Sequence, residues 1–388
     1  MELEAKNFQW LGNSIIYASV RFFASTNRPN FLQETPMRIR SAISNLGTYK
    51  PPLEGRNPKE YLLMDFNESP EPPPLSVRKA LQDYLVQGDL HVYPQYGNFC
   101  EELGDYAGVP ADQLLLTNGS DQGIDVVLRC LLEPGTNLVM AMPGFTMFKQ
   151  TVGTIGADFI EVPYPDDFAF PYEQIRQAVN AQTRIIVVIN PNNPTGTSAP
   201  LEQVEALLQE FPDCAVLVDE AYYEFTGKTC LSLLGKYSNL VVIRTFSKAF
   251  AIPSLRLGYV VAREEFINEL LKIRGPYDVN MAAIVAARAL LQDRKPWQKL
   301  VQHLMGESKP ALEQFLKEHG VKFYPGEANF LLVEPKGGAA PAVSFLKEQG
   351  ILVRPMRPPL EHCFRMSLRR IEDMKMFFSA WQSVEIIL

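Results

Sequence analysis

Apolar residues follow two alternating patterns from about residue 60 to residue 275. Segments with helical spacing separate short runs of apolar and β-branched residues, which are typical of buried strands. The predicted strands are residues 114–117, 137–140, 159–162, 185–190, 215–219, 240–244 and 258–262. The clearest helical patterns between them are residues 121–132, 201–210 and 264–273. This alternation predicts an α/β fold with a seven-stranded, mainly parallel sheet covered by helices on both faces.

The pattern changes after about residue 278, where helices and strands follow one another in a shorter region. Helices are predicted at 281–291, 297–318 and 342–349, and strands at 329–333, 351–354 and 364–368. These elements predict a smaller α+β domain. We therefore expect four parts: an N-terminal extension at 1–36, an arm at 37–60, a large domain at 61–277 and a small domain at 278–388. Met37 is an alternative start of the chain. The arm is expected to pack on the small domain or on a partner subunit.

The composition argues against several kinds of partner and against a metal site. The 388 residues carry a net charge of −7 without a long basic run, which argues against a nucleic-acid or anionic membrane partner. The five cysteines are scattered and form no CxxC pair, which is typical of reduced thiols in the cytoplasm. The four histidines lack metal-ligand spacing, so we expect no metal, and no apolar stretch is long enough to span a membrane.

Polar residues stand at the carboxyl ends of the predicted strands, where open α/β sheets bind their ligands. The first group, Gly119, Ser120 and Asp121, follows the strand at 114–117 and opens a helix. The glycine permits a tight turn, and the free N–H groups and positive end of the helix form a natural cradle for a phosphate. The same residues also fit an ordinary helix start in which Ser120 or Asp121 is the N-cap.

Two further strand ends carry an amide loop and a carboxylate. The loop at residues 190–196 holds Asn193 between two prolines, a composition that is also common in ordinary loops. Asp219 closes the strand at 215–219, and a buried carboxylate is costly unless it faces a cation, such as a protonated pyridine nitrogen. Tyr222, three residues later, could reach a hydroxyl on the same ring. Asp219 alone would equally suit the N-cap of the next helix.

A lysine follows the next strand in an apolar setting. Desolvation among the neighbouring aromatic and aliphatic residues lowers the pKa of the Lys248 amine and makes it a nucleophile that can form a Schiff base. The hydroxyls of Thr245 and Ser247 and the guanidinium of Arg256 suit a phosphate. Each feature alone is common. Their combination at the ends of separate strands indicates an enzyme that binds pyridoxal-5′-phosphate (PLP) through Lys248 and moves an amino group.

At these residues the chain resembles the aspartate-aminotransferase superfamily, which comprises PLP enzymes of fold type I. Within this superfamily it most closely resembles the class II histidinol-phosphate aminotransferases. The resemblance runs from about Arg38 to the C-terminus. It is carried by the stretches Asn67-Glu68-Ser69-Pro70, Tyr93-Pro94, Gly119-Ser120-Asp121-Gln122, Pro143-Gly144-Phe145, 191–196, 218–222 and 244–250. The implied fold is that of the type I PLP-dependent transferases.

The resemblance implies a role for each cofactor residue. Lys248 holds PLP as a Schiff base, and Asp219 pairs with the pyridinium nitrogen. The backbone around Ser120 and Asp121 cradles the cofactor phosphate. The other implied contacts are those of Gly119, Thr245, Ser247 and Arg256 with the phosphate, of Asn193 and Tyr222 with the 3-oxygen of the ring, and of Phe145 stacked on the ring.

The resemblance also implies substrates and a partner. Tyr93 matches a tyrosine that reaches the cofactor phosphate of the neighbouring subunit, which implies a homodimer. Arg365 matches the arginine that receives the substrate carboxylate. Arg354 and Tyr49, with Asn193, lie in segments that would bind the other substrate groups, including the phosphate ester of histidinol phosphate. The substrates are then a small-molecule amino donor and a 2-oxo acid acceptor in cytoplasmic histidine biosynthesis.

Other reactions on the same fold stay open. Phe145 stands where the family usually has tyrosine, Gln122 replaces the commoner glutamate, and the segment after Arg365 lacks the usual glycine. An aromatic amino-acid aminotransferase or a threonine-phosphate decarboxylase would use the same cofactor residues. A PLP-binding transcription regulator would need a DNA-binding module, and residues 1–60 show no basic two-helix pattern.

Overall fold

The computed structural model describes residues 37–88 and 90–384, so the predicted extension at 1–36 lies outside the described residues. Residues 37–40 belong to a separate unit, and all elements below belong to the unit that begins at Ser41. Its helices are α1 (Ser41–Ser44), α2 (Leu75–Gln87), α3 (Phe99–Ala107), α4 (Gly119–Leu131), α5 (Met147–Ile155), α6 (Tyr172–Ala178), α7 (Leu201–Glu210), α8 (Tyr223–Thr226), α9 (Glu264–Leu271), α10 (Met281–Gln292), α11 (Lys295–His303), α12 (Lys309–Glu318), α13 (Ala339–Glu348) and α14 (Ile371–Val384), with a π turn at Leu304–Ser308. Its strands are β1 (Leu62–Met64), β2 (Leu114–Thr117), β3 (Asn137–Met142), β4 (Asp158–Pro163), β5 (Thr183–Ile189), β6 (Ala215–Asp219), β7 (Leu240–Thr245), β8 (Gly258–Val261), β9 (Lys322–Tyr324), β10 (Phe330–Glu334), β11 (Ile351–Pro355) and β12 (Phe364–Ser367).

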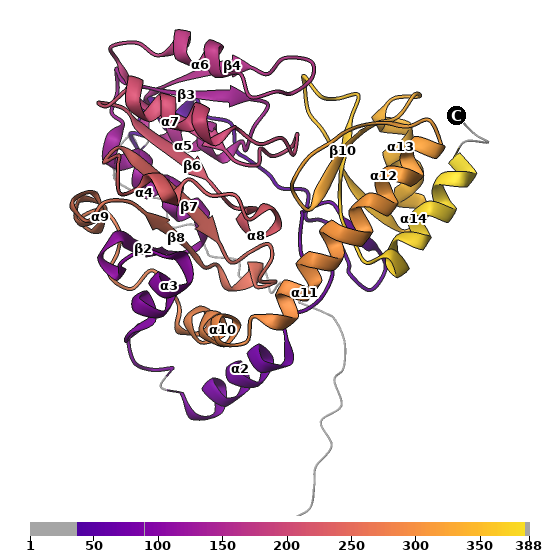
Figure 1. Cartoon of the computed structure of the whole chain (residues 1–388), viewed down its shortest axis with the longest axis horizontal. Helices are drawn as coiled ribbons and strands as arrows, with labels where there is room; N and C mark the ends of the chain where they lie inside the picture. The colour runs from indigo at the N-terminus through magenta and orange to yellow at the C-terminus, as the bar shows by residue number, and fades with distance from the viewer. Residues whose placement is uncertain (1–36, 89, 385–388) are drawn as a thin grey trace, which may run out of the picture. The chain divides into compact units, whose positions relative to one another are not determined.

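The larger sheet has seven strands in the order β2-β8-β7-β6-β5-β3-β4 (Figure 1). The neighbours from β7 to β4 are parallel, and β8 runs antiparallel to both β2 and β7. In β5, Ile185 and Val187 pack into one apolar core with α4, and Ile186 and Val188 pack into the opposite core with α7. Successive side chains of a strand point to opposite faces, so a fully apolar strand needs cover on both. The predicted seven-stranded, mainly parallel sheet is confirmed.

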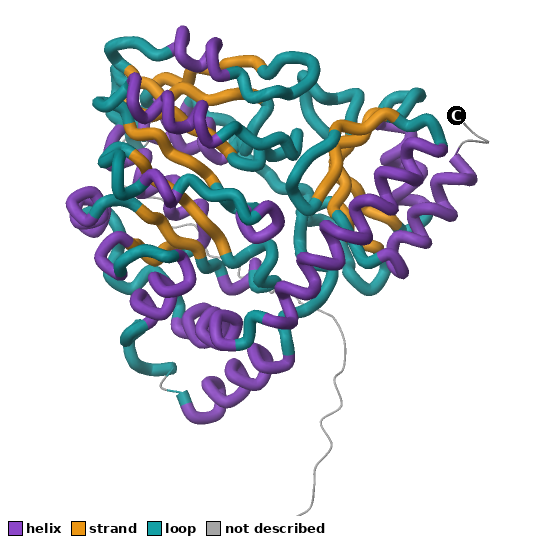
Figure 2. The backbone as a smooth tube through the Cα atoms, viewed as in Figure 1, coloured by secondary structure: helices purple, strands orange, loops and turns teal. Residues whose placement is uncertain are grey.

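The smaller sheet has five strands in the order β1-β11-β12-β10-β9. Strand β1 is parallel to β11, and the other neighbours are antiparallel. Helix α13 packs on β11 and α12 on β9, and Figures 1 and 2 show α12, α13 and α14 gathered beside this sheet. This arrangement is the smaller α+β domain that the sequence predicts.

Two elements pack with the other domain than the one in which the predicted boundaries at residues 61 and 278 place them. Strand β1 falls within the predicted large domain but pairs with β11 of the smaller sheet, where Leu62 lies opposite Ile351. Helix α10 falls within the predicted small domain but packs against α2 and α3 (Figure 1). Apolar spacing shows that an element has a buried face, and it does not show which element covers that face. The predicted domain limits therefore stay a proposal, and β1 and α10 are two elements that they do not describe correctly.

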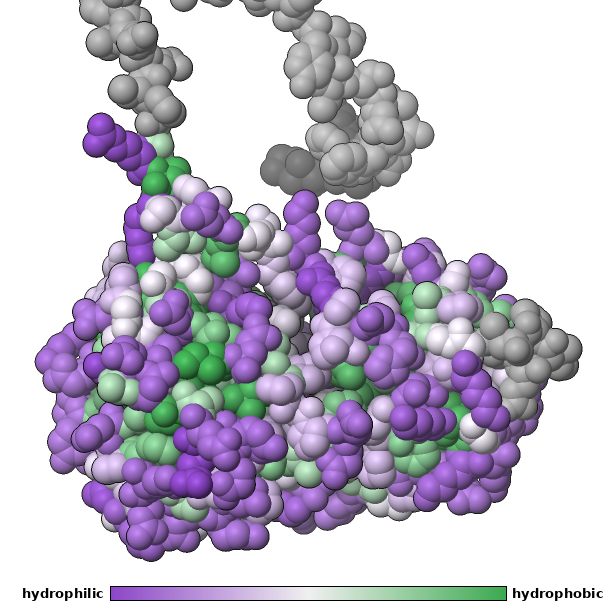
Figure 3. Space-filling view, turned by 90° about the horizontal axis from the view of Figure 1, so that it is seen from above, coloured by the Kyte–Doolittle hydropathy of each residue, from purple (hydrophilic) through white to green (hydrophobic). Residues whose placement is uncertain are grey.

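Among the helices within residues 37–88 and 90–384, none combines the length and the apolar character that crossing a membrane requires. Figure 3 shows polar residues over most of one face, with apolar patches between them.

Candidate active site

Two adjoining cavities lie at the carboxyl ends of β5, β6 and β7, with volumes of about 220 Å³ (inner) and 440 Å³ (outer). Both are lined by Phe66, Phe145, Asn193, Tyr222 and Lys248. Among the predicted site residues, the inner cavity adds Ser120, Asp121, Asp219, Thr245, Ser247 and Arg256, and the outer cavity adds Tyr49, Arg354 and Arg365. The fold thus brings together all predicted site residues except Gly119 and Tyr93, which line neither cavity.

The start of α4 meets a cationic side chain beside the inner cavity. Gly119 has φ +74°, a left-handed conformation that glycine adopts without steric cost, and a Cβ there would lie 2.5 Å from Arg256 Nη2. Arg256 Nη2 pairs with Asp121 Oδ2 at 2.8 Å, and the N-cap of α4 is Asn118, whose side chain makes no capping hydrogen bond. Thr245 donates to Ser247 Oγ at 2.9 Å nearby. Helix N–H groups, a guanidinium and hydroxyls therefore converge where a phosphate would be stabilised.

Asp219 ends β6 as a buried carboxyl group. Its side chain is 4% exposed, and Oδ1 accepts the backbone N–H of Ala221 at 3.0 Å. Burial raises the pKa of Asp219 to about 7, although the Ala221 N–H and the nearby Lys248 act in the opposite direction. Because burial disfavours the charged form, this carboxylate would gain most from a cation in the inner cavity.

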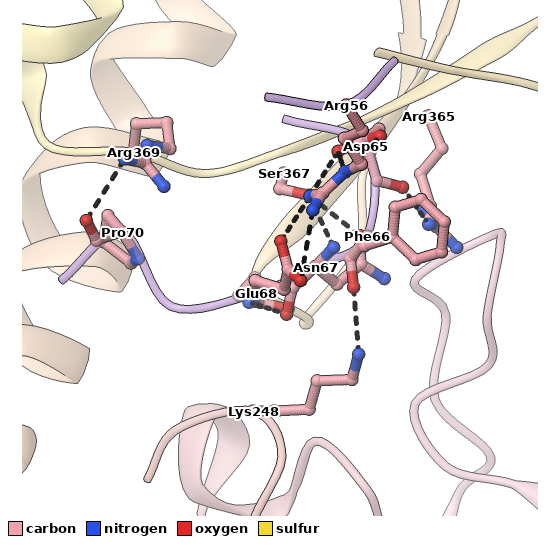
Figure 4. Close-up of polar contacts among 11 residues, drawn as sticks. Arg56, Asp65, Phe66, Asn67, Glu68, Pro70, Lys248, Arg365, Ser367 and Arg369 are labelled. Carbon is pink, nitrogen blue, oxygen red and sulfur yellow. Dashed lines mark hydrogen bonds and ion pairs between the residues drawn. The ribbon is translucent and has the colours of Figure 1, made fainter. Parts of the chain in front are cut away.

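Lys248 follows β7 and reaches the boundary of the two cavities. Its Nζ donates to the backbone carbonyl of Phe66 at 3.0 Å (Figure 4). Burial, together with the positive charge of Arg365, lowers the pKa of Lys248 to about 8. The direction of this shift is the one that the apolar sequence around Lys248 predicts. A neutral amine is therefore accessible near neutral pH.

Tyr222 and Asn193 line both cavities, and Arg365 lines the outer one beside them. Burial raises the pKa of the Tyr222 phenol, so the hydroxyl keeps its proton. Arg365 donates to Asn193 Oδ1 and, through Nη2, to the backbone carbonyl of Asp65 at 2.7 Å. These bonds hold the amide and the guanidinium in one orientation relative to each other.

The outer cavity is lined by cations and by no carboxylate among the described residues. The cations are Lys50, Lys248, Arg354, Arg357 and Arg365, accompanied by the Tyr49 ring. Burial, together with charge repulsion from Arg354, lowers the pKa of Arg365 to about 10. Within the described part of the chain, Arg354 Nη1 and Arg365 Nε are buried without a hydrogen-bond partner. Buried donors of this kind suit an anionic ligand.

The class I and II aminotransferase family matches residues 59–380 of this chain. The chain belongs to this family. The histidinol-phosphate aminotransferase of Brevibacillus brevis is 34% identical to it over 334 residues, which cover 82% of this aminotransferase and 90% of that protein. The histidinol-phosphate aminotransferase of Dehalococcoides mccartyi is 33% identical over 344 residues, which cover 86% and 94% of the two chains.

Solved structures share the fold of this aminotransferase. The histidinol-phosphate aminotransferase from Sinorhizobium meliloti, in complex with pyridoxal-5′-phosphate, has a TM-score of 0.80 and 25% identity and covers 89% of this chain and 96% of its own. The L-threonine-O-3-phosphate decarboxylase from Porphyromonas gingivalis has a TM-score of 0.73 and 23% identity and covers 83% and 99%, a likeness that shows the fold alone. The predicted family and fold class are confirmed.

One segment of the aminotransferase site has no predicted role. Residues 65–68 pass beside Lys248, and the side chains of Asp65 and Glu68 are held by Arg56 (Figure 4). The sequence marks Asn67-Glu68 only as part of a family-like stretch. The hydrogen bonds of Asn67 join it to residues 155 to 300 positions away, so no local signal could have identified them.

Tyr93 lies away from both cavities of its own chain. It is 71% exposed, and its ring stacks on Tyr277 with centroids 4.4 Å apart. This position agrees with a role in a neighbouring subunit, which stays a prediction.

Proposed function

We propose that this aminotransferase uses pyridoxal-5′-phosphate to transfer the amino group of histidinol phosphate to 2-oxoglutarate. The observation that carries the proposal is the junction of two cavities at Lys248. The inner cavity joins a phosphate cradle to a buried carboxyl group, and the outer cavity is lined by cations. The names of the relatives that are 33–34% identical to this chain support the choice of substrate.

The residues of the inner cavity fit PLP group by group. The phosphate would lie at the start of α4, where a Cβ at Gly258 would come within 2.6 Å of the Ser120 nitrogen, so any side chain at position 258 would displace the backbone of the cradle. Gly119, Ser120, Asp121, Thr245, Ser247 and Arg256 would hold it. Asp219 would face the pyridine nitrogen, Tyr222 and Asn193 the 3-oxygen, and Phe145 the ring face. The bound cofactor supplies an electron sink for the carbanion that forms at the substrate α-carbon.

Lys248 performs two tasks in this proposal. Its pKa of about 8 leaves a substantial neutral fraction near neutral pH, so Nζ can attack the cofactor aldehyde. When it is free, the same Nζ would act as the general base for the proton of the substrate α-carbon. Asp219 keeps the ring nitrogen protonated, which lets the ring accept electrons.

The outer cavity accounts for two different anions. Histidinol phosphate carries a phosphate ester where glutamate carries its α-carboxylate, so one cationic region must serve both. Arg365 would bind either anion, because it is buried and fixed by Asn193 and Asp65. Arg354 and Tyr49 would add contacts that a doubly charged phosphate needs more than a carboxylate does.

Absorbance spectroscopy tests the proposed reaction. The purified protein should carry the absorbance band of a lysine-bound cofactor, which bleaches with histidinol phosphate and returns with 2-oxoglutarate. Bleaching by tyrosine or phenylalanine but not by histidinol phosphate would support an aromatic aminotransferase instead. Release of CO₂ from threonine phosphate would support the decarboxylase.

We further propose that the enzyme is a cytoplasmic homodimer. The support for the dimer is that Tyr93, with Tyr277 stacked on it, and the preceding Leu85, Val86 and Leu90 are all exposed apolar side chains. The support for the cytoplasm is that all five cysteines are free thiols.

Subunit complementation tests the dimer. The variants Lys248→Ala and Tyr93→Ala should each be weakly active alone. Their mixture should regain activity, because a mixed dimer contains one site with a native Lys248 and the partner's native Tyr93. A mixture as inactive as its components, under conditions where subunits exchange, would contradict a shared site.

A further inference from the structure

A chain of three buried hydrogen bonds gives the Tyr222 hydroxyl a fixed direction. We propose that Asn67 is a positioning residue that directs the hydroxyl proton of Tyr222 toward the 3-oxygen of the cofactor. The inference rests on the proposed use of PLP and adds a residue to which neither the sequence nor the family resemblance assigns a role.

The first two bonds fix the orientation of the Asn67 amide. The backbone N–H of Asn67 donates to Ser367 Oγ at 2.8 Å, so the Ser367 oxygen is an acceptor there. The Ser367 hydroxyl hydrogen is then free to be donated to Asn67 Oδ1, at 3.1 Å. With Oδ1 engaged, the amide nitrogen is the end that faces Tyr222. Both residues are 1% exposed, which keeps water from competing for these bonds.

The third bond determines what Tyr222 can do. Asn67 Nδ2 donates to Tyr222 Oη at 2.9 Å. An amide N–H can only donate, so the phenol oxygen accepts, and its own hydrogen must point to another acceptor. Burial raises the pKa of Tyr222, which keeps that hydrogen in place. Because Tyr222 lines both cavities beside Asn193 and Lys248, the remaining direction leads into the proposed cofactor site.

The backbone of Asn67 is held for this task. Its φ of +55° lies in the left-handed region, where asparagine is tolerated better than most side chains. Its carbonyl accepts from Asn329 Nδ2 at 3.2 Å, and the carbonyls before it accept from Arg365 and Lys248 (Figure 4). Ser367 belongs to β12 of the smaller sheet and Tyr222 follows β6 of the larger one, so Asn67 links the two sheets at the site.

A spectroscopic double-mutant cycle tests the inference. The readout is the pH midpoint of the absorbance change of the bound cofactor, measured without substrate. Tyr222→Phe should raise this midpoint by about one pH unit. The anionic 3-oxygen loses a hydrogen-bond donor in this variant, so its negative charge holds the proton on the neighbouring lysine nitrogen more strongly. Asn67→Asp replaces the donor by an acceptor that takes the Tyr222 proton, so it should raise the midpoint too.

The cycle separates the direction of the proton from the added charge. In the Tyr222→Phe background there is no hydroxyl proton to redirect, so Asn67→Asp changes the midpoint only through its added charge. The shift that Asn67→Asp causes should therefore be smaller by about one pH unit in this background than in the native background. The neutral variant Ser367→Ala frees the amide and should give a smaller upward shift that disappears in the same background. Equal shifts in both backgrounds would overturn the inference, since Asn67 would then act independently of Tyr222.

The same measurement distinguishes a failure of the proposed function from a failure of the role of Asn67. A native protein without a cofactor absorbance band would overturn the proposed function, and this inference with it. A native protein with the band, and variants that change only the unfolding temperature, would leave the proposed function standing and overturn the role of Asn67.

Discussion

Lys248 offers the most direct quantitative prediction from the structure. Burial and the charge of Arg365 lower its pKa from 10.5 to about 8. Each pKa unit corresponds to about 1.4 kcal/mol, so the buried ammonium is disfavoured by roughly 3 kcal/mol. At pH 7.5 about a quarter of the Lys248 amines would be neutral, against about one in a thousand for an ordinary lysine.

Competitive labelling measures this pKa in cofactor-free protein. A trace of acetic anhydride modifies only neutral amines, and peptide mapping from pH 5 to pH 11 gives the midpoint for each lysine. We expect a midpoint near 8 for Lys248, and a higher midpoint in the variant Arg365→Gln, which removes a repulsive charge. Lys299, which is exposed on α11, serves as the reference amine and should not respond to that variant.

The same shift has a consequence for stability. The folded pKa lies below the unfolded value, so charging Lys248 destabilises the folded protein below pH 8, and this penalty disappears as the pH rises from about 8 to 10.5. Lys248→Met should therefore stabilise cofactor-free protein at pH 7 by up to roughly 3 kcal/mol and gain little above pH 10.5. A labelling midpoint at or above 10, or a Lys248→Met variant no more stable than the native protein at pH 7, would refute the reasoning.

Three further predictions concern other parts of the site and core. Asp219→Asn should lower kcat/KM about a hundredfold in a transamination assay, because it removes a charged hydrogen-bond partner worth up to about 3 kcal/mol, and an unchanged value would exclude the ring-nitrogen role. Arg354→Gln should raise the KM for histidinol phosphate about 10- to 100-fold and affect glutamate less; equal effects on both would contradict a phosphate contact. Arg244→Met should destabilise the protein by about 3–5 kcal/mol in chemical denaturation, because it leaves Glu220, paired at 2.8 Å and 0% exposed, as an isolated buried charge. The double variant with Glu220→Leu should recover much of that loss, and a double variant as unstable as the single one would show that the pair is not the cause.

The sequence predicts the strands of the larger sheet well because those strands are apolar on both faces. Strand β5 is apolar along most of its length, and this pattern has few alternatives in a chain that alternates with helices. Strand β1, by contrast, has three residues, and its partner β11 lies almost 300 positions later. Strand β9, also of three residues, is not among the predicted elements, and neither is α14, whose 14 residues mean that length is not the reason it was missed. Short elements carry too little pattern to be recognised without their tertiary partners.

In the site, too, residues with informative neighbours in the sequence can be predicted, and contacts between residues far apart in the sequence cannot. Asp219 and Lys248 are predictable as members of one site because polar residues at the ends of several separate strands form an unusual combination, although each residue alone is common. The bond from Lys248 to the Phe66 carbonyl spans 182 positions, and the bond from Asn67 to Ser367 spans 300. Contacts over such distances depend on how the two sheets pack. They therefore emerge only from the folded structure.

Reduction with borohydride tests the central claim most directly, because it turns a Schiff base into a stable secondary amine. After reduction of the purified protein, peptide mapping should find the phosphopyridoxyl group on the peptide that contains Lys248, and on no other lysine. The label on a different lysine, or no label in protein that retains transaminase activity, would contradict the account.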